Sequence, residues 1–68
     1  MTDPLTWEGT YAIALALKEA HPNMDLEKVS LGMIEVWTLA LKQFEDDPAL
    51  VNEEILSAIY QEWFEEIL

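Results

Sequence analysis

Three apolar segments with helical spacing dominate this chain of 68 residues. Apolar side chains recur in them every three or four positions, which places those side chains on one face of a helix. The few prolines and glycines fall near the ends of the segments, where they interrupt helical structure. We therefore predict an all-α fold in a single domain of residues 1–68. Its expected form is a small three-helix orthogonal bundle with a short connector and an acidic loop.

The first predicted helix runs from about Thr10 to His21, and its inner face carries Ile13, Leu17 and Ala20. Pro22 ends this helix, because the residue before a proline is pushed out of the α region. We expect Trp7, just before the helix, to pack back onto the core.

A connector follows from Asn23 to Leu31, in which we expect a short extended stretch around Ser30. The second predicted helix runs from about Met33 to Phe44. Gly32 is its expected cap, and Glu35 is then the acidic residue of the first turn. The predicted inward face is Met33, Trp37, Ala40, Leu41 and Phe44.

Three consecutive acidic residues and Pro48 break the second helix, since carboxylates oppose the macrodipole at a helix C-terminus. Asn52 is the predicted cap of the third helix, and Glu53 and Glu54 stand in its first turn, where the dipole favours them. The predicted buried stripe is Ile55, Leu56, Ile59, Trp63 and Ile67. We expect Trp37, Phe44 and Trp63 to be structural residues of the core.

Fourteen acidic residues against three lysines give a formal net charge of −11 at pH 7. This balance argues against binding to nucleic acids or to anionic membranes, because both need cationic side chains. No stretch approaches the length of a membrane span, and no basic leader is visible, so we expect a cytoplasmic protein. The 68 residues lack cysteine, so they cannot hold an iron–sulphur cluster by thiolates.

Few residues could support catalysis. His21 is the only histidine, Ser30 and Ser57 are the only serines, and no glycine-rich phosphate loop is present. A hydrolytic enzyme needs a nucleophile with a base beside it, and the sequence nominates no such pair. We predict that the chain is not an enzyme and binds no cofactor tightly.

The densest acidic group is the feature that most needs a functional explanation. It consists of Glu45, Asp46, Asp47, Glu53 and Glu54. Three interpretations are open: a contact surface for a basic partner, a weak and open metal site, and plain solvation. For a partner surface the candidates are Asp25, Asp46, Asp47, Glu53 and Glu54. For a metal site they are Glu45, Asp46 and Asp47.

The stretch from Phe44 to Trp63 reads Phe-x-Asp-Asp-Pro-x-x-x-Asn-Glu-x-Ile-Leu-x-Ala-Ile-x-x-x-Trp. With Trp7, Ile13 and Pro22 in register, it resembles the IscX family over residues 7–66 without a gap. The resemblance implies a helical fold related to the winged helix. It also implies a non-catalytic adaptor or regulator of iron–sulphur cluster assembly. Such a protein binds cysteine desulfurase through its acidic surface, competes there with bacterial frataxin and binds ferrous iron weakly.

The alternative is a generic acidic interaction domain, either a charge mimic of nucleic acid or a helical homo-oligomer. Tyr11, Leu15 and Leu39 stand where the family tends to be charged or polar. Exposed apolar patches usually mark interfaces, so this difference indicates an additional contact, of which self-association is one form. Dimerisation that buries Leu15 and Leu39 would favour the homo-oligomer.

Overall fold

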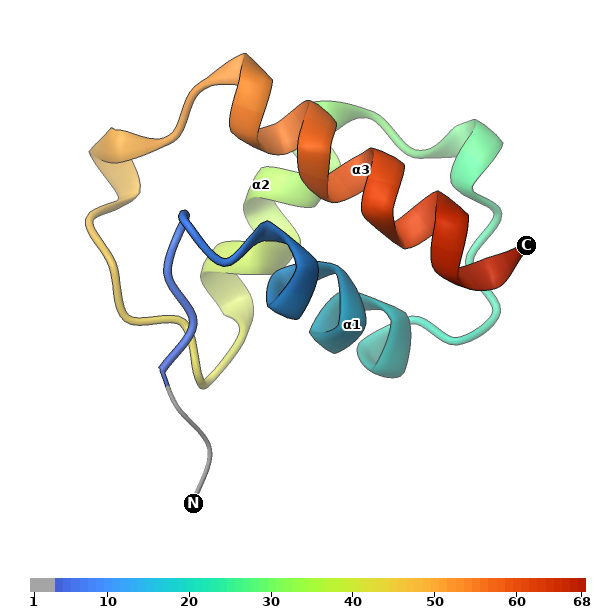
Figure 1. Cartoon of the computed structure of the whole chain (residues 1–68), viewed down its shortest axis with the longest axis horizontal. Coiled ribbons are helices and arrows are strands. Elements are labelled where there is room, and N and C mark those ends of the chain that lie inside the picture. The colour runs from blue at the N-terminus through green and yellow to red at the C-terminus, as the bar shows by residue number, and fades with distance from the viewer. Residues whose placement is uncertain (1–3) are drawn as a thin grey trace.

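The computed structural model describes residues 4–68, which contain three α-helices and no β-strand. Helix α1 spans Thr10–Ala20, α2 spans Leu31–Ala40 and α3 spans Glu53–Ile67 (Figure 1). Short 3-10 turns at Leu26–Lys28 and Pro48–Leu50 lie in the two connections. The all-α prediction is confirmed. The relation to the winged helix and the single domain over 1–68 stay predictions, and residues 1–3 lie outside the described part.

The core lies where α3 crosses the other two helices. Helix α3 contacts α1 more extensively than it contacts α2. Trp63 is the largest fully buried side chain, with 1% of its surface exposed, as its predicted structural role requires. Trp37 and Phe44 are only partly buried and pack against the core from its edge. The other buried apolar residues are Leu5, Trp7, Ile13, Ala14, Leu17, Leu26, Val29, Ile34, Leu56 and Ile59.

Helix α2 begins two residues earlier than predicted and ends four residues earlier, at Ala40. Its cap is Ser30, whose Oγ accepts a hydrogen bond from the Met33 N–H at 3.2 Å. The Ser30 N–H donates in return to the Met33 sulphur at 3.5 Å. The predicted Gly32 cap was wrong because a glycine offers no side-chain acceptor, whereas a serine does.

The inward face of α2 also differs from the prediction. Ile34 and Thr38 are fully buried, whereas Met33 and Ala40 are exposed. The apolar residues of α2 point to most sides of the helix, so their spacing alone could not identify its buried face. In α1 the prediction holds for Ile13 and Leu17 but not for the exposed Ala20.

The connector and α3 agree better with the sequence. Val29 and Ser30 have extended backbone, as expected around Ser30, whereas Leu31 already begins α2 and residues 26–28 form a 3-10 turn. Asn52 caps α3 as predicted, and its Oδ1 accepts from the Ile55 N–H at 2.9 Å. The buried stripe of α3 is confirmed except at its ends, where Ile55 is partly buried and Ile67 is 46% exposed.

The segment before α1 lies beside the loop that follows α2 (Figure 1). Leu5 and Phe44 form an isolated parallel bridge. The Leu5 N–H donates to the Gln43 carbonyl at 2.8 Å, and the Glu45 N–H donates to the Leu5 carbonyl at 2.9 Å. The rings of Trp7 and Phe44 pack edge to face, with 4.6 Å between their centroids. Trp7 is only 2% exposed, so it packs onto the core as predicted.

Candidate functional site

The acidic loop is held in place by hydrogen bonds to Trp7. The Trp7 backbone N–H donates to Asp46 Oδ2 at 3.0 Å, and its indole Nε1–H donates to the Asp47 carbonyl at 2.9 Å. The other oxygen of Asp46 accepts the Asp47 N–H at 2.7 Å. Asp47 Oδ1 then accepts the Ala49 N–H at 2.9 Å and caps the turn Pro48–Leu50. These two carboxylates therefore shape the loop.

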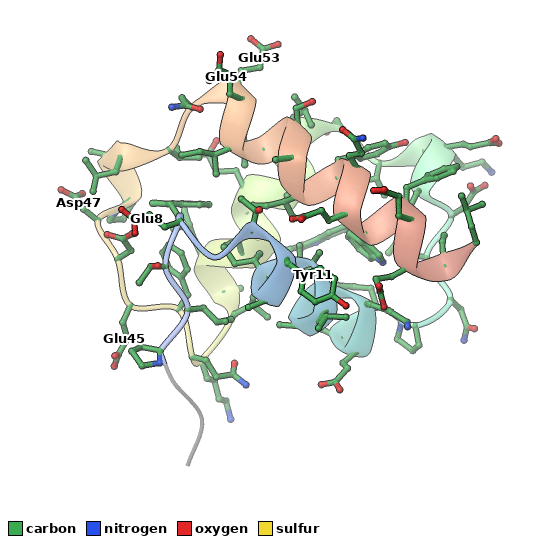
Figure 2. The ribbon with its side chains drawn as sticks, in the orientation of Figure 1. Glu8, Tyr11, Glu45, Asp47, Glu53 and Glu54 are labelled. Carbon is green, nitrogen blue, oxygen red and sulfur yellow. The ribbon has the colours of Figure 1, made fainter. Side chains whose placement is uncertain are left out.

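The remaining acids of the group are free to meet a partner. Glu45, Glu53 and Glu54 are exposed, and their carboxylates make no hydrogen bond or ion pair within residues 4–68. Figure 2 shows Glu53 and Glu54 projecting from the start of α3, with Asp47 projecting from the neighbouring loop. Glu53, Glu54 and Asp47 thus lie toward one end of the molecule, whereas Glu45 lies at the other end of the acidic loop (Figure 2).

An open groove of about 640 Å³ separates the N-terminal segment and the acidic loop from the start of α3. Its apolar lining comes from Trp7, Leu50, Ile55 and Ala58. Its polar lining comes from Glu8, Thr10, Asp46 and Glu54. The lining therefore combines three acids with four apolar residues and includes no basic residue. Such a surface favours a ligand that is both cationic and partly apolar.

Sequence reasoning missed Glu8. Figure 2 places this exposed side chain on the same side as Asp47, although the two residues are 39 positions apart. The link is Trp7, whose bonds to Asp46 and Asp47 bring the N-terminal segment to the loop. No local pattern marks such a pairing. A tryptophan indole N–H that must find a buried acceptor was the one available signal.

Asp25 lies apart from this group. It caps the turn Leu26–Lys28, and its Oδ1 accepts the Glu27 N–H at 3.1 Å. That turn lies across the molecule from the acidic loop in Figure 1. The structure therefore gives Asp25 a local capping role and does not join it to the other candidates, so its partner contact stays a prediction.

The described residues do not form a ready-made metal site. Within residues 4–68, no three histidine, cysteine or acidic side chains are grouped so that they could hold an ion. Both oxygens of Asp46 and one of Asp47 already accept backbone N–H groups. Weak iron binding by Glu45, Asp46 and Asp47 stays a prediction, and any such site would need the loop to rearrange.

A separate polar cluster joins α1 and α3. The Tyr11 hydroxyl donates to Glu66 Oε2 at 3.2 Å, and Lys18 Nζ lies 3.8 Å from Glu66 Oε1. This hydrogen bond and the Glu66 charge raise the pKa of Tyr11 above its ordinary value of 10.0. Desolvation of the half-exposed phenol and the charge of Glu62 raise the pKa further. This cluster fastens two helices together away from the groove.

The comparisons with known proteins fit this picture. A family model described as iron–sulphur cluster assembly matches residues 5–68. The chain belongs to the IscX family. Membership in this family supports a role in iron–sulphur cluster assembly. The family is an accessory family of that process.

A relative from Pseudomonas aeruginosa, the uncharacterized protein PA3808, is 36% identical over 62 residues. The match covers 91% of this IscX-family chain and 94% of the relative. Among the described residues, no helix is both long and apolar enough to cross a membrane.

Proposed function

We propose that this IscX-family chain is a non-catalytic, cytoplasmic adaptor or regulator that binds a cysteine desulfurase through its acidic side. The observation that carries the proposal is the placement of Glu8, Asp47, Glu53 and Glu54 on one side of a molecule with a net charge of −11 (Figure 2). Opposite charge on a partner would speed association, and the attraction would weaken in salt.

The acids on this surface have two different roles. Asp46 and Asp47 hold the loop, whereas Glu8, Glu53 and Glu54 present carboxylates that no described residue neutralises. Competition with bacterial frataxin follows if both proteins use one basic surface on the desulfurase. The same surface would bind ferrous iron weakly.

The test is the affinity of the chain for purified cysteine desulfurase at low and high salt. The informative variant is Glu53→Gln with Glu54→Gln, and its matched control is Glu19→Gln with Glu65→Gln. Both pairs remove two exposed charges, but the control charges lie near the C-terminal ends of α1 and α3. We expect the first pair to weaken binding about threefold to tenfold at low salt and the control to change it less than about twofold.

Absence of binding at low salt would refute the desulfurase as partner. Equal effects of the two variant pairs would show that net charge alone matters, and the acidic side would lose its special role.

A further inference from the structure

We propose that the groove beside the acidic loop holds a short segment of the partner in which an apolar side chain is flanked by lysine or arginine. The proposal rests on the proposed function, because the segment is taken to belong to the desulfurase. It adds a defined docking site to a surface that would otherwise act by charge alone.

Leu50 supplies exposed apolar surface to the groove. This residue is 59% exposed in the turn Pro48–Leu50, where it lines the groove with Ile55 and Ala58. An apolar side chain placed against these three residues would remove apolar surface from water on both molecules. A purely electrostatic contact would make no use of this lining.

The charge of the groove decides which class of segment fits. Glu8, Asp46 and Glu54 line the groove without a basic residue among its walls. An acidic segment would be repelled, and so would a second copy of this chain, since each carries a net charge of −11. A basic segment with an apolar side chain matches both the acidic and the apolar lining residues.

Hydrogen bonds and an aromatic contact hold the groove on the side of the acidic loop. Trp7 is fixed by its bonds to Asp46 and Asp47 and by its contact with Phe44. On the opposite side, the Asn52 cap fixes the start of α3. A segment that binds here would meet preformed walls, so little affinity is lost in ordering the site.

Two matched pairs of variants separate the groove from the general charge of the acidic side. Glu54 lines the groove and its neighbour Glu53 does not, although both are exposed in the first turn of α3. Leu50 lines the groove, whereas Val36, which is similarly exposed at 64%, lies on α2. Neither Leu50 nor Val36 belongs to the core, so both serine variants should fold, which far-ultraviolet circular dichroism would verify.

The 68-residue chain is labelled for NMR, and the probes are the peptide acetyl-Lys-Leu-Lys-amide and the equally charged acetyl-Lys-Ser-Lys-amide. We expect the leucine peptide to shift the amide signals of Trp7, Glu54 and Ala58 more strongly than the serine peptide does. Leu50→Ser should remove this preference and Val36→Ser should keep it. Equal shifts with the two peptides would overturn the proposal.

The same variants are then measured against the desulfurase. We expect Leu50→Ser to weaken binding about fivefold or more and Val36→Ser less than about twofold. Glu54→Gln should weaken it more than Glu53→Gln. If the desulfurase binds but both pairs give equal effects, the groove proposal falls and the proposed function stands. If the desulfurase does not bind, the proposed function fails, and the assignment of the segment to this partner fails with it.

Discussion

The backbone N–H of Trp7 donates a hydrogen bond to Asp46 Oδ2, 3.0 Å away and 39 positions along the chain. Asp46 thereby joins the N-terminal segment to the loop after α2, and its second oxygen fixes the next turn of that loop through the Asp47 N–H. A residue that looks like part of an acidic docking surface is thus first a structural residue. Binding experiments that reverse its charge would also disturb the fold.

Asp46→Ala should lower the free energy of unfolding by about 1–3 kcal/mol, because the Trp7 and Asp47 N–H groups both lose their acceptor. Asp46→Asn should cost less, since its amide oxygen can still accept one bond. Urea denaturation followed by tryptophan fluorescence measures the difference. Glu45→Ala is the control, because that exposed side chain makes no such bond within residues 4–68. Equal stability of the Asp46→Ala and Glu45→Ala variants would refute the structural role.

Asn52→Ala should destabilise the protein by about 1 kcal/mol, because the Ile55 N–H at the start of α3 loses its cap. Asn23→Ala provides the comparison, since Asn23 is exposed and donates or accepts no side-chain bond in the described chain. Thermal or urea unfolding reports both values. The capping account fails if the two alanine variants are equally stable.

Thr38→Val should stabilise the protein by about 1 kcal/mol. The Thr38 side chain is fully buried, and its hydroxyl has no hydrogen-bond partner within residues 4–68. Valine has nearly the same shape and removes a polar group that burial deprives of water. Thr38→Ser keeps the hydroxyl and loses the methyl group, so it should be less stable than the wild type. A valine variant less stable than the wild type would show that the hydroxyl is satisfied.

Glu66→Ala should lower the pKa of Tyr11 toward 10.0, because the Glu66 hydrogen bond is the largest cause of its rise. A raised pKa in the folded state favours the neutral phenol. The stability from this pair is therefore present below pH about 10 and is lost as pH rises through the raised pKa. Ultraviolet absorbance of the ionised tyrosine measures the midpoint, with Tyr11→Phe to assign it. Glu65→Ala should leave the midpoint unchanged, and an unchanged midpoint in Glu66→Ala would contradict the assignment.

The sequence predicts the local parts of this fold well. Helical spacing identifies all three helices, and Asn52 followed by two glutamates locates the start of α3 within a residue. The errors in α2 have a different cause. Its residues are apolar on most sides, so periodicity could not distinguish the buried Ile34 and Thr38 from the exposed Met33.

The site is less predictable because it depends on contacts that are distant in the chain. Glu45, Asp47, Glu53 and Glu54 could be grouped from their proximity in sequence. Glu8 lies on the side of Asp47, Glu53 and Glu54 only because Leu5 and Trp7 pair with residues 43–47. The structure also shows that both carboxylate oxygens of Asp46 accept backbone N–H groups, which a count of charges could not reveal.

The most direct test of the proposed docking surface is a heteronuclear NMR titration of the wild-type chain with cysteine desulfurase at low and high salt. We predict amide shifts centred on residues 46–54 and on Glu8 at low salt, and their loss at high salt as the charges are screened. Absence of shifts at low salt, or shifts confined to the exposed apolar residues Met33, Val36 and Leu39 of α2, would contradict an acidic docking surface beside the groove.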